Sequence, residues 1–407
     1  MHTSGQPPKY ITIVARKGRT EAYVTYESST WSETAKTIID EMIKAINGMA
    51  ADNAAKAANP QINSSTVKRS LYEGSTQYKS WRYSPEQLEQ VRTSLNAAAV
   101  AVIRDTFEAD ELGSSEDVLF LNANEEQLLV KLYITKIPQL CGHFRFPEEV
   151  EATAISYLKR FYLKNTVMDW HPKNVMLTAL FLATKTTNNP ISLESYTSNI
   201  PKTSSSDVLD LEFLVSQSLN FEFAVSHAHR ALWGIWLDLQ SLPDVSEDLR
   251  PQDVYDIAIK HVRASRFTDA ELIYTPSQIA LASLALVSPV LAERWADSKA
   301  AQPLSATLDP TLGSIKYIIT QMGHPPDVEA VREVDRRLKL CKNPEKVPGS
   351  KAYLARQTAE QRRAEEKRNK KAEDVRRAVT ESGNPFGSEL NEDEKAKQLA
   401  ELDDDDD

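Results

Sequence analysis

The feature that most constrains the fold of this chain is an internal repeat, offset by 104 residues (275 minus 171). At that offset HPKNVMLTALFLAT (171–184) matches TPSQIALASLALVS (275–288), proline on proline and large apolar residue on large apolar residue. Two more segments align in the same register: Ala154, Ile155, Leu158 and Lys159 fall on Ala258, Ile259, Val262 and Arg263, and Leu211, Phe213, Leu214 and Val215 fall on Ile315, Tyr317, Ile318 and Ile319. Three matches in one register predict two copies of a five-helix unit.

The proline-started segment of each copy is apolar on nearly every face. A helix without a polar stripe must be surrounded by other helices. We therefore expect an all-α fold of two tandem bundles, at 121–222 and 223–323, each built around its proline-started helix. The apolar pattern also predicts helices over about 124–141, 147–164 and 206–219.

Outside the repeats we expect an N-terminal extension with a linker at 1–78, a helical region at 79–120 and a C-terminal helix at 324–343. In the extension, YITIV and EAYVTY alternate like two short strands, SETAKTIIDEMIKAING is helical, and AADNAAKAANPQINSST is typical of a linker. In the helical region, Ser84 and Gln87 form a capping-box arrangement at the start of a helix whose first position is Pro85.

We expect residues 344–407 to form a charged, partly disordered tail. RRAEEKRNKKAEDVRR (362–377) interleaves bases with acids and predicts a solvated helix, with nuclear import as the sharper alternative. Beyond it, eleven acidic and two basic residues end in DDDDD, which is typical of a disordered acidic segment.

Charge and cysteine content exclude several classes of function. The net charge of −10 argues against a nucleic-acid surface, because phosphate binding needs clustered Lys and Arg. Cys141 and Cys341 lie 200 residues apart (341 minus 141) without zinc-site spacing, so neither a disulfide framework nor a metal centre is indicated. No signal peptide or membrane-length apolar run is present, and a soluble intracellular protein is expected.

No motif points to an active site, a metal or a cofactor. Phosphate loops, nucleophile elbows and HExxH are all missing from the sequence. His227 and His229 are two residues apart and are expected on different helix faces, as polar residues at a helix start. Asp169 and His171 precede Pro172 and are interpreted as capping residues. We expect no catalytic residue.

Two charges at the margins of apolar helices are the strongest candidates for binding. Lys185 ends the buried helix of the first copy, and Glu212 is flanked by Leu211 and Phe213. The second copy has Pro289 and Lys316 at the matching positions. A partly buried Lys185–Glu212 pair would therefore belong to one copy only, which favours binding to a partner over packing common to both.

These motifs together carry a family resemblance. RFYLKNTVMDWHPKNVMLTALFLATK, LIYTPSQIALASL and LNFEF resemble the cyclin family, and within it the cyclin H branch. KSWRYSPEQLEQVR and HPPDVEAVREVDRRLKLCK resemble the N- and C-terminal helices that flank its two cyclin boxes, so the resemblance runs from Lys79 to Asn343. It implies tandem five-helix cyclin boxes and a non-catalytic subunit that activates a cyclin-dependent kinase, here the CDK-activating kinase.

The resemblance also implies partners, a location and site residues. The partners would be that kinase, a RING-finger assembly factor and the core of the transcription factor TFIIH. In the nucleus, the kinase would phosphorylate the C-terminal repeats of RNA polymerase II and cell-cycle kinases. Direct contact with nucleic acid or membrane is not expected. The residues assigned to kinase binding are Lys185, Glu212, Phe221, Phe223, Thr186, Thr187, Trp81 and Tyr83. Phe221 and Phe223 are expected to alternate in an extended segment after the fifth helix and to present apolar surface to the kinase. Core packing between the repeats is an equal alternative for Phe221.

Two departures from the family pattern stand out. Many cyclins have acidic residues after the lysine, where this chain has Thr186, Thr187, Asn188 and Asn189, and LLVKLYITKI lacks the substrate-docking motif of cell-cycle cyclins. The alternatives are another transcriptional cyclin, or an adaptor that resembles general transcription factor B and would need a basic face.

Overall fold

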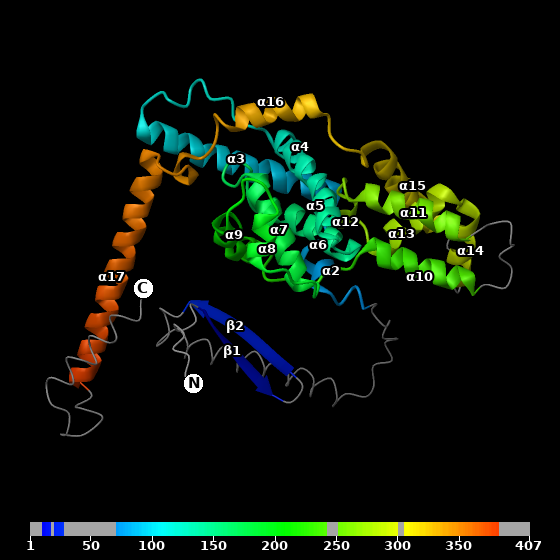
Figure 1. Ribbon diagram of the computed structural model, residues 1–407, viewed down its shortest axis with the longest axis horizontal. Coiled ribbons are helices and arrows are strands. Elements are labelled where there is room, and N and C mark those ends of the chain that lie inside the picture. The colour runs from blue at the N-terminus through cyan, green and yellow to red at the C-terminus, as the bar shows by residue number, and fades with distance from the viewer. Residues whose placement is uncertain (1–9, 18–19, 28–70, 242–250, 300–304, 382–407) are drawn as a thin grey trace. The chain divides into compact units, whose positions relative to one another are not determined.

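The computed structural model describes residues 10–17, 20–27, 71–241, 251–299 and 305–381 (Figure 1). It divides into two compact units, one of residues 1–68 with 365–407 and one of residues 69–364. The described part of the first unit includes an antiparallel hairpin of β1 (Tyr10–Lys17) and β2 (Thr20–Glu27), with Tyr10 opposite Glu27. This confirms the two predicted strands. The predicted helix and linker that follow, and the acidic segment beyond residue 381, lie outside the described residues.

The second unit opens with two helices, α2 (Thr76–Ser80) and α3 (Pro85–Asp110). Ser84 accepts a hydrogen bond from the Gln87 backbone N–H, and the Gln87 side chain accepts one from the Ser84 N–H. Pro85 occupies the first turn, where its missing N–H is not needed. The predicted capping box is confirmed.

The first repeat contains six helices among the described residues. They are α4 (Ala123–Ile134), α5 (Lys136–Phe144), α6 (Glu148–Phe161), α7 (Pro172–Thr186), α8 (Leu193–Ser198) and α9 (Ser205–Ser218). The single helix predicted over 124–141 is wrong, because α4 ends at Ile134 and α5 begins at Lys136. Pro138 explains the break: it has no N–H for the Ile134 carbonyl and its ring would clash with that carbonyl in a continuous helix.

The second repeat follows the same plan. Its helices in the described ranges are α10 (Ala228–Gln240), α11 (Pro251–Ser265), α12 (Ala270–Ile273), α13 (Pro276–Val287), α14 (Pro289–Lys299) and α15 (Ser305–Met322). At the offset of the repeat, α6 matches α11, α7 matches α13 and α9 matches α15. The all-α fold with an internal repeat is confirmed.

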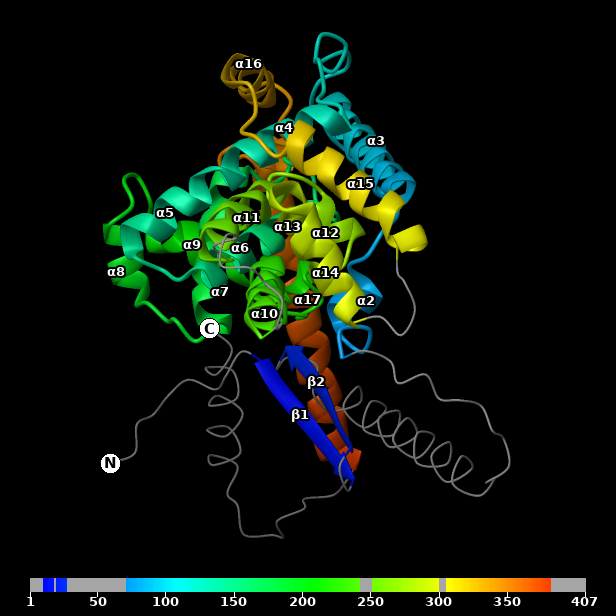
Figure 2. The same ribbon diagram turned by 90° about the vertical axis from the view of Figure 1, so that its right-hand side faces the viewer.

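Each repeat is built around its proline-started helix. All residues of α7 from Val175 to Thr184 are buried, and α7 packs against α4, α6 and α9. In the second repeat, α13 packs against α10, α11, α14 and α15, which Figure 2 shows grouped around it. A helix that is apolar all round needs such neighbours.

The chain returns to the first repeat after leaving the second. In α16 (Val328–Leu338), Val331, Val334 and Leu338 join the hydrophobic core of the first repeat. The Asn343 backbone N–H then donates to the Met168 carbonyl at 3.1 Å. A short 3₁₀ turn, η2 (Pro344–Lys346), leads to the long helix α17 (Lys351–Glu381).

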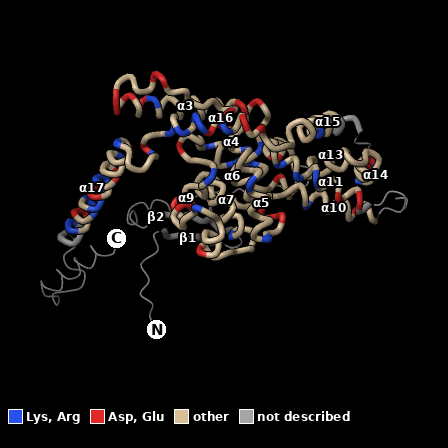
Figure 3. Tube along the Cα trace, turned by 45° about the horizontal axis from the view of Figure 1, so that its top comes forward, with Lys and Arg blue, Asp and Glu red and all other residues tan. Residues whose placement is uncertain are grey.

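Helix α17 contains the basic run at 362–377. Every one of these residues except the half-buried Ala372 is exposed, and Figure 3 shows acidic and basic residues interleaved along the helix. The predicted solvated helix is confirmed. Among the described residues, no helix combines the length and apolar character needed to cross a membrane.

Ion pairs form part of the contact between the repeats. Lys159 of α6 contacts Glu271 at 2.8 Å, and Arg266 reaches both Glu148 and Glu151 at 2.7 Å. Lys159 also donates to the Thr268 carbonyl at 2.6 Å. Buried charges need such partners, because an unpaired buried charge is costly.

These ion pairs predict a loss of stability in acid. Burial by itself would raise the pKa of Glu148, but hydrogen bonds from Arg263 and the charge of Arg266 outweigh burial and lower that pKa to about 2. A carboxyl with a lowered folded-state pKa stabilises the fold above its unfolded pKa, and this contribution is lost as pH falls. We expect the free energy of unfolding to fall between about pH 5 and pH 2.

Urea unfolding at each pH measures this effect. In the Arg266→Gln variant, the free energy of unfolding should fall less steeply as pH is lowered, because the change removes a cation that lowers the pKa of Glu148. Arg336→Gln, on an exposed ion pair of α16, is the control. Identical pH slopes in both variants would contradict the prediction.

Candidate partner-binding site

The predicted charge pair is formed. Lys185 lies in the last turn of α7 and Glu212 in the middle of α9, with Nζ and Oε1 2.6 Å apart. The Lys185 side chain is 42% exposed and that of Glu212 22% exposed. The Lys185 ammonium also lies 4.4 Å from the centre of the Phe181 ring, within cation–π range. An ion pair this open contributes only about 0–1 kcal/mol to stability, so stability alone does not account for it.

Exposed apolar side chains lie on the helix that carries Glu212 and directly after it. Phe213 is 45% exposed and Phe221 51% exposed, with ring centres 6.0 Å apart. Leu209, one turn before Phe213, is 47% exposed. We call Lys185, Glu212, Leu209, Phe213 and Phe221 the α7–α9 surface. Sequence reasoning missed Leu209 and Phe213 as members; the signal was their i, i+3, i+4 spacing with Glu212, which places all three on one helix face.

A row of aromatic rings connects this surface to the core of the first repeat. Phe223 is half-buried against the core of the first repeat, with its ring centre 6.3 Å from Phe221 and 6.1 Å from Tyr157. The Tyr157 hydroxyl donates to the Phe223 carbonyl at 2.7 Å. Phe221 is therefore the exposed member of the two, and core packing does not describe it.

The chain turns sharply at Phe221. An extended segment was expected there, but Asn220 and Phe221 have φ of 54° and 58°. The Phe221 N–H donates to the Ser216 carbonyl at 2.9 Å, which closes the end of α9. The expectation is wrong for this residue, because the α9 carbonyls require a left-handed turn. That conformation costs roughly 1–2 kcal/mol for a residue with a side chain.

The threonines after Lys185 are occupied within the chain. The Thr186 hydroxyl bonds the Tyr157 hydroxyl at 3.0 Å, and Thr187 donates to the Ala183 carbonyl at 2.7 Å. Both residues are half-buried. Their hydroxyls hold the end of α7 in place.

Trp81 and Tyr83 do not lie on the α7–α9 surface. Trp81 is only 1% exposed and packs with Leu88 and Leu272, with Tyr83 half-buried beside them. Trp81 therefore has no ring surface to offer a partner in this conformation. The physical reason is that α2 and the start of α3 fill a gap between the repeats, where an aromatic ring is covered from both sides.

The histidines and Asp169 have structural environments. The rings of His227 and His229 stack with centres 5.3 Å apart, contrary to the expected separation, because His227 lies in extended backbone before α10 rather than inside it. His171 caps α7 by accepting from the Lys173 N–H, as expected. Asp169 instead accepts from the Asn343 side chain at 2.7 Å, so its interpretation as a cap is wrong.

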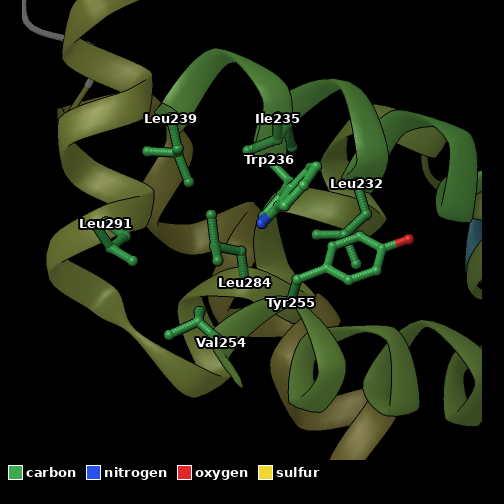
Figure 4. Close-up of a pocket in the computed structure, with 8 residues that line it drawn as sticks. All are labelled: Leu232, Ile235, Trp236, Leu239, Val254, Tyr255, Leu284 and Leu291. Atoms are coloured by element: carbon green, nitrogen blue, oxygen red, sulfur yellow. The ribbon is translucent and has the colours of Figure 1, made fainter. Parts of the chain in front are cut away.

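In the part of the chain that the structure describes, neither a metal centre nor the apolar pocket of the second repeat offers a site for chemistry. Within the described ranges, no group of three or more His, Cys, Asp or Glu could hold a metal. A small pocket of the second repeat is lined by apolar and aromatic side chains (Figure 4): Leu232, Ile235, Trp236, Leu239, Val254, Tyr255, Leu284 and Leu291. Tyr255 is the one titratable side chain among the eight, and burial raises the pKa of its hydroxyl, so the hydroxyl stays protonated and is a poor nucleophile.

Two family models match the chain. The N-terminal domain of cyclins matches residues 104–224, and the C-terminal domain of cyclins matches residues 227–324. Cyclin mcs2 of Schizosaccharomyces pombe is 31% identical over 301 residues, 71% of this chain and 91% of that protein. Cyclin CCL1 of Saccharomyces cerevisiae is 36% identical over 241 residues, 56% of this chain and 61% of that protein, so less than two thirds of it is matched.

Solved structures give the same result. The CAK complex of Chaetomium thermophilum bound to ATP-gamma-S contains a chain with a TM-score of 0.63 and 28% identity, covering 79% of this chain and 97% of that one. A chain of the yeast TFIIK (Kin28/Ccl1/Tfb3) complex has a TM-score of 0.52 and 33% identity, covering 61% of this chain and 100% of that one.

Proposed function

Because the chain belongs to the cyclin family, we propose that it is the regulatory subunit that binds and activates a cyclin-dependent kinase of the CDK-activating kinase type. The relatives are cyclins of this branch, and the structural neighbours come from CAK and TFIIK complexes. The chain is a regulator of phosphoryl transfer rather than a catalyst. The observation that carries the proposal is the open Lys185–Glu212 pair among exposed aromatic rings.

The α7–α9 surface is the proposed kinase-binding site. Exposed aromatic side chains and a fixed cation suit a specific protein interface, where a few such residues provide most of the binding energy. Lys185, Glu212, Phe213 and Phe221 are its proposed contacts. Thr186, Thr187 and Phe223 support it from the half-buried layer beneath, and Trp81 and Tyr83 act from further away.

Activation follows if this surface binds only one state of the kinase. Protein kinases are active when a lysine–glutamate ion pair is assembled beside the nucleotide, and the glutamate is carried by a mobile helix. A partner that binds that helix only in its inward position shifts the population toward the active state. The cyclin supplies binding energy, and all catalytic groups belong to the kinase.

We extend the proposal to the larger assembly. The yeast neighbour is a three-protein complex that includes Tfb3. A RING-finger assembly factor, the TFIIH core and a nuclear location follow for this chain by the same reasoning. The kinase would then phosphorylate the C-terminal repeats of RNA polymerase II and cell-cycle kinases. Contact with DNA is not proposed, since the net charge is −10.

Reconstitution tests the function. The purified full chain should transfer no phosphoryl group to a peptide of polymerase repeats. It should stimulate a monomeric kinase of this class about 100-fold, the gain expected when an active state populated at about 1% becomes dominant. Affinity capture that recovered no protein kinase, or salt-sensitive binding to promoter DNA without stimulation, would contradict the proposal and favour the adaptor alternative.

A further inference from the structure

The left-handed turn at Phe221 is held by the residues on either side of it. Asn220, Phe221 and Glu222 join α9 to the segment that enters the second repeat. Phe221 is exposed and its backbone is in a region that side chains disfavour. Unfavourable backbone geometry persists only where surrounding contacts enforce it.

Glu222 is fixed by the C-terminal end of α2. Its Oε2 accepts a hydrogen bond from the Trp81 indole N–H at 2.6 Å, and its Oε1 accepts one from the Ser80 hydroxyl at 3.1 Å. The Glu222 backbone carbonyl also faces the Arg160 guanidinium at 3.4 Å. Hydrogen bonds to a carboxylate are stronger than neutral ones, so both side-chain oxygens are well held.

Asn220 is fixed from the other side. Its Oδ1 accepts from the Lys164 ammonium at 2.6 Å. The Lys164 ammonium and the Arg160 guanidinium both lie over the Trp81 ring, 5.1 Å and 5.0 Å from its centre. One buried indole therefore connects the anchors of both neighbours of Phe221.

We propose that Glu222, anchored by Trp81 and Ser80, is a positioning residue that holds the Phe221 ring outward for the kinase. This inference rests on the proposed function, since it assumes that Phe221 contacts the kinase. It assigns Trp81 an indirect role: the indole acts through Glu222 rather than by touching the partner. We call Trp81, Ser80 and Glu222 the turn clamp.

A double-mutant cycle tests the turn clamp. The full chain is titrated against its monomeric kinase, and the dissociation constant is measured for Glu222→Ala, Phe221→Ala and the double variant. Each single change should raise the dissociation constant about tenfold. In the chain that already carries Phe221→Ala, Glu222→Ala should raise it by less than a further factor of about two, because the effects of coupled residues are not additive. If Glu222→Ala weakened binding independently of Phe221, the double variant would instead show the full product of the two single effects.

The conservative variant provides a second readout. Glu222→Gln should bind within about twofold of the native chain, because its amide oxygen can accept from Trp81 and its amide N–H can donate to the Ser80 hydroxyl. If Glu222→Ala fails to fold, Trp81→Phe replaces it in the cycle, since it removes only the indole donor and keeps an aromatic ring. Arg92→Gln breaks the ion pair with Asp269, away from the turn, and should leave affinity unchanged.

The outcomes separate the two levels of the proposal. If Phe221→Ala weakens binding and Glu222→Ala does not, or if the two add fully, the turn clamp is overturned and the proposed function stands. If neither Phe221→Ala nor loss of the Lys185–Glu212 pair affects the kinase, the binding surface is wrong and this inference fails with it. Non-additivity together with retention in Glu222→Gln supports the turn clamp.

Discussion

Replacing Lys185 and Glu212 together by alanine is expected to lower kinase stimulation about 100-fold while the cyclin stays folded. Interface residues that contribute to binding cost more than about 1 kcal/mol when truncated. Two truncations at about 1.4 kcal/mol each, a factor of ten apiece, give about a 100-fold loss of affinity. The fold should tolerate the change, because an exposed ion pair contributes about 0–1 kcal/mol. The measurement is kinase activity as the concentration of the variant rises.

A matched pair elsewhere on the chain controls for the loss of two charges. On α16, a guanidinium nitrogen of Arg336 lies 2.6 Å from a carboxylate oxygen of Glu333, and both side chains are exposed. Their double replacement by alanine should leave both stimulation and thermal stability unchanged. If Lys185→Ala with Glu212→Ala stimulated the kinase as well as this control does, the α7–α9 surface would not be the binding site.

Leu180→Ala is expected to destabilise the first repeat strongly. Leu180 is fully buried at the centre of α7, and its counterpart Leu284 is buried in α13. Truncating such a leucine costs about 2–5 kcal/mol, since the lost transfer energy is joined by the cavity left behind. Urea unfolding of the cyclin without its kinase measures this loss.

The repeat offers a matched comparison for the same experiment. Leu284→Ala should destabilise the second repeat by a similar amount, whereas Leu237→Ala, on the exposed face of α10, should change stability by less than about 0.5 kcal/mol. Equal effects from the buried and the exposed leucines would mean that α7 and α13 are not the central helices of their repeats.

The sequence was most informative where apolar periodicity and burial coincide. The helices matching at the 104-residue offset were predictable, since their apolar faces must be covered. The Lys185–Glu212 pair was predictable because each residue is a charge at the edge of an apolar helix without an evident partner nearby in sequence, and the two charges are opposite. The roles in kinase contact and the domain boundaries stay predictions, among them the division between 222 and 223.

Errors arose where distant parts of the chain decide the local structure. Trp81 packs against Leu272 of the second repeat and donates to Glu222, which lies 141 residues away in sequence. The left-handed turn at Phe221 has a local cause, the carbonyls at the end of α9. The break before Pro138 was available from the sequence and was missed. Leu209 and Phe213 were missed because local pattern alone cannot tell an exposed apolar residue from a core residue.

The return of α16 to the first repeat makes the second repeat an insertion within the first. Residues that precede the second repeat and residues that follow it both belong to one hydrophobic core. If the second repeat unfolds alone, its roughly 100 residues form a loop whose two ends stay bound to the first repeat. Closing a loop of this length costs about 4 kcal/mol of free energy, which makes the unfolded state of the second repeat less favourable. Helix α16 thus acts as a non-covalent analogue of a disulfide: it stabilises the second repeat by restricting its unfolded chain.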